Sequence, residues 1–185
     1  EYMGVGLPGE AAGTLNDRGL NNPVVRTTLP YGYGLAISPL HLTQGYLAFA
    51  SGGLRMPLTI LKQTDRPHAE RVIEESLARE VVEMMESVTA REGTAPGARV
   101  PGYRISGKTG TSRKVGAGGY DDTRHVALFA GMAPASDPRF VMVVVINEPK
   151  GEEVGGGAVS GPVFGQVAGR ALRLLGVGPD AERAI

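Results

Sequence analysis

The sequence predicts an α+β fold in which an antiparallel sheet is flanked by helices. Three observations support this: helical periodicity before residue 90, three segments of strand character between residues 103 and 147, and a helical pattern at residues 161–175. The 28 glycines among 185 residues favour strands joined by tight turns over a helical bundle. The length is that of one domain, and a hydrophobic content of 42% is enough to form a core.

Composition and charge exclude several classes of function. Because 19 basic residues balance 19 acidic ones, no net field attracts nucleic acid, and no nucleic-acid partner is expected. The lack of cysteine excludes a disulfide framework and cysteine catalysis. His41, His68 and His125 have no further ligand at metal-binding spacing, so we predict no metal. No apolar run is long enough to span a bilayer and no signal peptide is visible, so any anchor is expected outside this chain.

The first predicted helix follows an irregular start. Residues 1–30 are rich in Gly, Asn and Pro without a sustained period, which predicts connecting structure. Ser38 is a potential N-cap, Pro39 suits a first turn, and Gly52 can end a helix. We therefore predict a buried helix at residues 39–51.

A second helix is predicted from Ser76 onward. Apolar side chains recur there at helical spacing, and we expect them to face the core: Leu77, Val81, Met84, Met85 and Val88. Charged residues occupy the opposite face of this helix.

Three strands and a closing helix are predicted in the second half of the chain. The strands are Tyr103 to Thr111, Arg124 to Met132 and Arg139 to Asn147. The turn at residues 134–138 is too short for a parallel crossover, so the last two strands are expected to form an antiparallel hairpin. A helix is predicted at residues 161–175, with Ser160 as its cap, Pro162 in its first turn and Gly176 at its end.

One segment, GYRISGKTGTS at residues 102–112, carries the residues of a catalytic motif. Gly102 to Thr109 fits the phosphate-binding pattern G-x-x-x-x-G-K-T, and Lys108-Thr109-Gly110 fits the K-T-G motif of penicillin-binding proteins and serine β-lactamases. A phosphate-binding loop requires a helix that begins at Lys108. Several glycines follow Thr109, so the nucleotide interpretation is disfavoured.

An edge strand is the better interpretation of the K-T-G segment. In a strand, Lys108 and Gly110 point to one face, and Thr109 and Thr111 point to the other. Lys108 supplies positive charge, the threonine hydroxyls can hydrogen-bond a carboxylate, and Gly110 permits close approach of a ligand backbone. This chemistry suits a peptide that ends in a free carboxyl group.

Beyond K-T-G, the chain resembles the class B penicillin-binding proteins of cell division. The similar segments are KTGTSRKV from Lys108, FAGMAPA from Phe129, VVVINEP from Val143, LPGE from Leu7, YGYGL from Tyr31, MMESV from Met84 and GGAVSGPVF from Gly156. The resemblance implies the penicillin-binding transpeptidase or serine β-lactamase-like fold. It favours a septal transpeptidase over a β-lactamase.

The resemblance also implies a function and a location. The family cross-links peptidoglycan stem peptides ending in D-alanyl-D-alanine during septal cell-wall synthesis, by serine acyl transfer, and is the target of β-lactams. Its members act with divisome proteins at the periplasmic face of the bacterial inner membrane, where the anchor is expected in a segment outside this chain. No cofactor is implied.

Roles for the motif residues follow from the same resemblance. Lys108 is expected in the catalytic hydrogen-bond network. Thr109 and Thr111 are expected to bind the substrate or β-lactam carboxylate, with Gly110 allowing close approach. The Thr111 amide is expected to contribute to the oxyanion hole, where it stabilises the charge that develops in the transition state.

Two elements of the family are missing from this sequence. No serine is followed by lysine three residues later, so S-x-x-K with its nucleophile is absent, and S-x-N is absent as well. We therefore expect residues 1–185 to be the C-terminal portion of a single transpeptidase domain, inactive alone and partnered by its upstream segment. The alternative is a non-catalytic scaffold of the same fold that binds peptidoglycan or a divisome protein.

Overall fold

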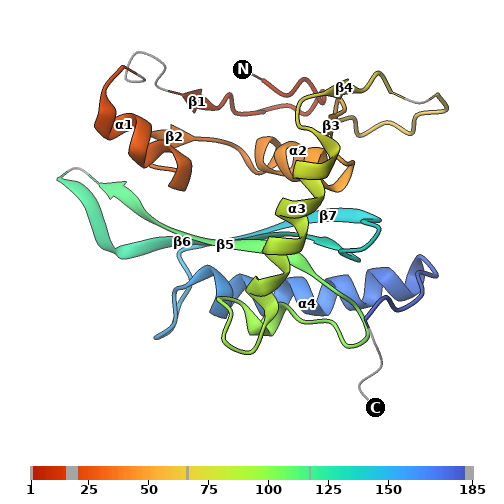
Figure 1. Cartoon of the computed structure of the whole chain (residues 1–185). Helices are drawn as coiled ribbons and strands as arrows, with labels where there is room; N and C mark the ends of the chain where they lie inside the picture. Colours follow the sequence, from red (N-terminus) through yellow and green to blue (C-terminus); the bar gives the residue numbers. More distant parts are fainter. Residues whose placement is uncertain (1, 16–20, 66, 117, 182–185) are drawn as a thin grey trace.

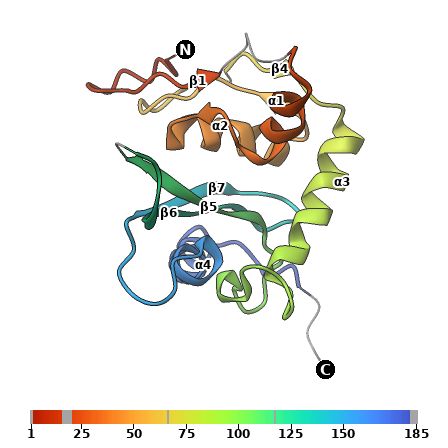
Figure 2. The ribbon, with the colours of Figure 1, turned by 90° about the vertical axis from the view of Figure 1, so that its left-hand side faces the viewer.

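Helices cover both faces of one central sheet (Figure 1). The computed structural model describes residues 2–15, 21–65, 67–116 and 118–181. Seen along the layers in Figure 2, helix α2 (Pro39–Ala50) lies above the sheet, α4 (Gly156–Leu174) lies below it, and α3 (Glu75–Glu86) runs along its side. The predicted α+β fold with an antiparallel sheet flanked by helices is confirmed.

The central sheet contains β5 (Ser106–Gly116), β6 (Gly119–Ala133) and β7 (Phe140–Asn147), paired in that order. All three predicted strands are therefore confirmed, and β6 and β7 form the predicted antiparallel hairpin. Strand β5 starts later than predicted and continues beyond Thr111, with a register shift between Arg113 and Lys114. Within the described residues β5 and β7 are the two edges of this sheet.

The start of the chain contains more regular structure than predicted. A short helix, α1 (Pro23–Thr28), begins at the cap Asn22, whose side chain accepts a hydrogen bond from the Val24 amide. Asn followed by Pro is a sequence pattern for a helix start, and this pattern is present at residues 22–23. Of the stretch predicted as irregular, residue 1 and residues 16–20 lie outside the described part of the chain.

Two two-stranded sheets complete the upper layer. Strand β1 (Thr14–Leu15) pairs with β2 (Leu35–Ala36), and β3 (Leu54–Arg55) pairs with β4 (Glu70–Arg71), both antiparallel. These short pairs connect α2 to the segments on either side of it. Both pairs lie in the upper layer, above the central sheet (Figure 1).

Helix α2 is confirmed, but it is half-buried instead of buried. Its cap Ser38 accepts a hydrogen bond from the His41 amide, as the sequence indicated, and Gly52 and Gly53 have positive φ at the end of the helix. Only Ala48 of this helix is buried. The reason is that α2 packs on the sheet with one side and leaves the other side uncovered within the described residues.

Helix α3 turns only part of the predicted face inward, since Val81 and Met85 are half-buried and Met85 packs against the cluster that contains Val82. Ala78 and Val82 are buried, whereas Leu77 is 50% exposed and Met84 is 58% exposed. Val88 is buried as expected, in the 3-10 turn after α3. The prediction for Leu77 and Met84 was wrong because only one narrow side of α3 contacts β5 and α2, whereas the apolar side chains span a wider arc.

Helix α4 begins five residues before the predicted start. Its N-cap is Gly155, and Ser160 is buried inside the helix instead of capping it. Pro162 consequently lies in the helix interior, while Gly176 has the positive φ expected at the helix end. Within the described residues, no helix combines the length and the apolar character needed to cross a membrane.

The main core lies between the sheet and α4. Phe129 of β6 and Phe164 of α4 are fully buried and meet edge to face, with ring centroids 4.8 Å apart. Ile105 and Leu172 are buried in the same cluster. On the opposite face a smaller cluster joins Val82 of α3 to the sheet. The sheet is therefore anchored firmly below and covered more loosely above.

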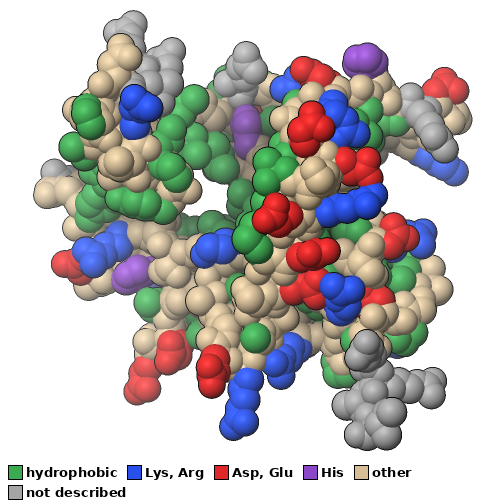
Figure 3. Space-filling model, viewed as in Figure 1, with side chains coloured by type: hydrophobic (Ala, Val, Ile, Leu, Met, Phe, Trp, Pro, Cys, Tyr) green, Lys and Arg blue, Asp and Glu red, His purple; other side chains and the backbone are tan. Residues whose placement is uncertain are grey.

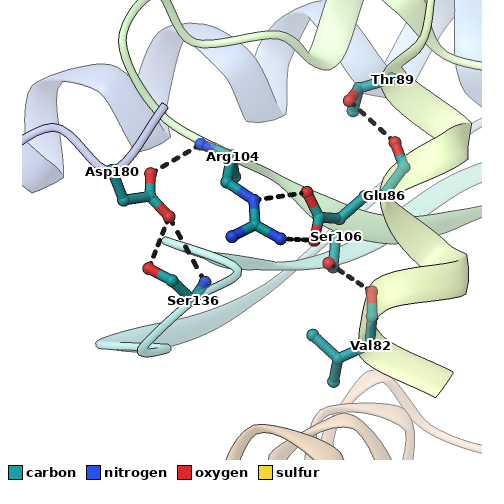
Figure 4. Close-up of polar contacts among 7 residues, drawn as sticks. All are labelled: Val82, Glu86, Thr89, Arg104, Ser106, Ser136 and Asp180. Atoms are coloured by element: carbon teal, nitrogen blue, oxygen red, sulfur yellow. Dashed lines mark hydrogen bonds and ion pairs between the residues drawn. The ribbon is translucent and has the colours of Figure 1, made fainter. Parts of the chain in front are cut away.

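A polar network fixes the entry into β5 (Figure 4). The Arg104 guanidinium donates two hydrogen bonds to the Glu86 carboxylate, at 2.9 and 2.6 Å. Asp180 accepts from the Arg104 amide at 2.7 Å and from the Ser136 hydroxyl at 2.6 Å. The buried Ser106 hydroxyl donates to the Val82 carbonyl of α3 at 2.7 Å. These contacts hold the residues that directly precede the K-T-G segment.

Candidate active site

The K-T-G segment occupies the outer strand of the sheet. Lys108, Gly110 and Thr111 pair with Ala130, Leu128 and Ala127 of β6, and β5 has no second partner strand within the described residues. No helix begins at Lys108, so the segment is not a phosphate-binding loop. The sequence-based prediction of an edge strand is confirmed.

The side chains of this strand alternate as predicted. A Cβ at Gly110 would meet the Leu128 side chain at 2.9 Å, on the α2 side of the sheet. Thr111 points to the opposite side, where its Oγ1 accepts a hydrogen bond of 3.0 Å from the Gly156 amide at the start of α4. The Thr109 hydroxyl also points that way and donates to Thr94 Oγ1 at 3.3 Å. The two threonines therefore lie together near the first turn of α4.

Lys108 presents an exposed ammonium group beside the strand. Its Nζ donates to the Thr109 carbonyl at 3.1 Å, and no carboxylate lies within ion-pair distance of it in the part of the chain that the structure describes. The positive charge is thus available to a group that approaches the edge of β5. Lys108 lines two cavities, one shared with α3 and the segment that follows it, and one shared with α2 and the segment that precedes it.

A groove of about 630 Å³ runs between the K-T-G strand and the upper layer. Its lower wall is formed by residues 108–112 with Leu128, and its upper wall includes Leu42 and Tyr46 of α2. Figure 3 shows hydrophobic side chains on both sides of the hollow between the α1–α2 layer and the sheet. Burial raises the pKa of Tyr46 to about 12, so this phenol is neutral at physiological pH.

The first turn of α4 approaches the sheet so closely that only glycine fits. A Cβ on Gly156 would lie 2.2 Å from the Leu128 carbonyl oxygen and 2.4 Å from that of Gly110. A Cβ on Gly157 would lie 1.8 Å from the Thr94 carbonyl oxygen. This approach brings the Gly156 amide to Thr111. The sequence pattern predicted that this helix starts after Gly156 and Gly157. A Gly-Gly pair at that place was nevertheless a signal that the backbone approaches another segment closely.

Other residues near the site were not predicted from the sequence. Thr94 reaches Thr109 from the segment after α3, and Lys114 of β5 forms an ion pair with Glu148 at 2.7 Å. Glu152 and Glu153, in the loop before α4, are exposed. Spacing in the sequence offered no indication of the Lys114–Glu148 pair, because its members are 34 residues apart and meet only through the pairing of three strands.

An α+β fold with K-T-G on an exposed edge strand is typical of the penicillin-recognising serine enzymes, which include penicillin-binding proteins and β-lactamases. Residues 1–169 match the family described as penicillin binding protein transpeptidase domain. The chain therefore belongs to the penicillin-binding protein transpeptidase family.

Curated relatives are similar over almost the whole chain. The peptidoglycan D,D-transpeptidase FtsI of Escherichia coli K12 is 45% identical over 177 residues, which is 96% of this chain and 30% of the relative. The probable peptidoglycan D,D-transpeptidase PenA of Neisseria gonorrhoeae is 42% identical, with the same coverage. The chain thus spans about 30% of the length of these relatives.

Solved structures of the family have the same fold. The transpeptidase domain of Burkholderia pseudomallei penicillin-binding protein 3 has a TM-score of 0.89 and 44% identity, over 96% of this chain and 54% of that chain. Penicillin-binding protein 3 of Mycobacterium tuberculosis, in complex with ampicillin, has a TM-score of 0.87 and 30% identity, over 100% of this chain and 45% of that one. Both confirm the predicted fold.

Proposed function

We propose that this chain is part of a peptidoglycan D,D-transpeptidase that cross-links stem peptides ending in D-alanyl-D-alanine by serine acyl transfer and is acylated by β-lactams. The observation that carries the proposal is the K-T-G segment on the free edge of β5, with Lys108 and Thr111 on opposite faces of the strand. The names of the E. coli and Neisseria relatives point to the same reaction.

Each residue of the segment has a role that its position supports. The Lys108 ammonium stabilises negative charge near the reacting carbonyl, and the Thr109 and Thr111 hydroxyls bind the terminal carboxylate. The Thr111 amide donates to the developing oxyanion. Gly110 keeps the strand free of a side chain on the groove side. Leu128 already fills the space that a Cβ would need there.

The serine nucleophile belongs to an upstream segment of the same domain, so that residues 1–185 form its C-terminal portion. Four features of the described residues support this. The groove beside K-T-G is open, a cavity of about 510 Å³ adjoins Lys108 and Met84, and Leu77 and Met84 of α3 are exposed. The β7 edge adds an apolar strand without a partner within the described part. An upstream segment that carries strands and helices would cover these surfaces.

The location and partners follow from the same proposal. The protein would act at the periplasmic face of the bacterial inner membrane, held there by a segment outside this chain, because its substrate is peptidoglycan. Divisome proteins are its proposed protein partners. Neither the substrate nor the reaction requires a cofactor, since serine acyl transfer proceeds without one.

Labelling with fluorescent penicillin tests this proposal. The complete protein, with its upstream segment, is expected to be labelled covalently at one serine, whereas the isolated 185-residue chain is expected to remain unlabelled. The physical reason is that no serine of this chain has a lysine three residues later to activate it. A folded complete protein without labelling would support the scaffold alternative. Stoichiometric labelling of the isolated chain would refute the division of the site between two segments.

The substitution Thr111→Val in the complete protein is expected to slow acylation about 10- to 100-fold, because a hydrogen bond to a charged carboxylate is lost while the shape is kept. The measurement is the second-order acylation rate for several β-lactams that bear a carboxylate. Thr27→Val on the exposed helix α1 is the matched control. An unchanged rate for all these β-lactams would exclude the Thr111 hydroxyl from carboxylate binding.

A further inference from the structure

We propose that Glu148 is a positioning residue, which together with Lys114 holds the loop of residues 149–155 against β5 and thereby orients the Thr111 hydroxyl for carboxylate binding. This inference rests on the proposed function. The proposed site then includes Glu148, which lies between β7 and α4 and touches no substrate itself.

The first anchor of this loop is an ion pair that crosses the sheet. Lys114 lies on the edge strand β5, Glu148 directly follows β7, and the Lys114 Nζ donates to Glu148 Oε1 at 2.7 Å. The two side chains are 30% and 31% exposed, and Arg124 Nη1 of β6 lies 4.0 Å from the same oxygen. The hydrogen bond and charge of Lys114 hold the pKa of Glu148 below its usual range. Glu148 is thus ionised and bound at neutral pH.

The backbone of Glu148 is also held in an unusual conformation. Its φ is 53°, in the left-handed region that residues with side chains rarely adopt, and it is the one non-glycine residue with positive φ in the described part of the chain. Its amide donates to the His125 carbonyl of β6 at 2.8 Å. Such a conformation persists where several contacts determine it, and here they turn the chain sharply from β7 into the loop.

The second anchor is the bond between Gly156 and Thr111. Since Thr111 Oγ1 accepts from the Gly156 amide at 3.0 Å, the hydroxyl proton is left to donate to another acceptor. Both ends of the loop are therefore attached to β5, at Lys114 and at Thr111, three positions apart. Movement at the Glu148 end would shift the start of α4 and, with it, the direction of the Thr111 hydroxyl.

The test uses Glu148→Gln in the complete protein, which keeps the size of the side chain and removes its charge. Acylation by a carboxylate-bearing β-lactam is expected to slow about 5-fold, as for loss of a partly screened ion pair. The loss is expected in binding, with the maximal acylation rate little changed. With a β-lactam whose carboxylate is esterified, Glu148→Gln and wild type are expected to react at equal rates, since no carboxylate then contacts Thr111.

The matched control is Asp122→Asn, which breaks the exposed Arg113–Asp122 pair on the same hairpin. It is expected to leave both rates unchanged. A double variant, Glu148→Gln with Thr111→Val, is expected to be no slower than Thr111→Val alone, because both changes act on the same hydroxyl. If Glu148→Gln fails to fold, Lys114→Met removes the other partner of the pair and gives the same comparison.

The outcomes separate this inference from the proposed function. If the complete protein is not acylated, the proposed function fails. If wild type and Thr111→Val behave as expected but Glu148→Gln matches Asp122→Asn, only the role of Glu148 is wrong. Equal slowing of the free acid and the ester, or full additivity with Thr111→Val, would also overturn that role, because either result indicates a general structural effect.

Discussion

Replacing Lys108 by alanine is expected to slow penicillin acylation of the complete protein about 100- to 1000-fold, the range found when one preorganised group that stabilises transition-state charge is removed. Lys108 is exposed at the edge of β5 and has no carboxylate partner within the described residues, so its charge remains available to the reacting groups. The nucleophile lies on another segment in this proposal. The substitution therefore acts across the junction between the two segments.

The measurement compares acylation rates of the wild-type and Lys108→Ala proteins, with circular dichroism to verify that both are folded. Lys62→Ala, on the exposed segment between β3 and β4, is the control for removal of one surface charge. Equal rates for wild type and Lys108→Ala would remove Lys108 from the active site. Gly107 to Gly110 would then be an ordinary strand whose match to K-T-G has no catalytic meaning.

The substitution Gly156→Ala is expected to destabilise the domain by about 3 kcal/mol, because the added methyl group would overlap two backbone carbonyl oxygens that no rotamer change can move away. The oxygens belong to Leu128 and Gly110 and would lie 2.2 and 2.4 Å from the new Cβ atom. Helix α4 must shift away from the sheet to relieve the overlap. The Gly156 amide would then leave Thr111, so acylation is expected to slow as well.

Gly155→Ala is the matched control for this substitution, since Gly155 has an ordinary φ of −72° and a Cβ there would meet nothing within 4 Å. Thermal or urea unfolding of the complete protein gives the two free energies of unfolding. If Gly156→Ala unfolds at the same denaturant concentration as Gly155→Ala, the close approach between α4 and the sheet is not the reason for glycine at position 156.

Strands β6 and β7 were predictable because each contains an apolar run bounded by turn residues, whereas β5 is mostly polar and was predicted from its alternating side chains. The β6–β7 hairpin was predictable from the short turn alone. The edge strand at Lys108 to Thr111 was predictable because the glycines after Thr109 disfavour the helix that a phosphate-binding loop needs. By contrast, the start of α4 was placed too late. Its first turn is rich in glycine, which has low intrinsic helix propensity, and the helix forms there because α4 packs against β5 and β6.

Local pattern and short spacing were sufficient to establish the fold class, the K-T-G segment with its alternating side chains, and the absence of a serine with an activating lysine. Three other features became visible only in the folded chain: the buried face of α3, the start of α4, and the contact between Glu148 and Lys114. These features depend on which distant segments come into contact. Strand pairing and close backbone approach decide that, and neither is encoded in the period of a single segment.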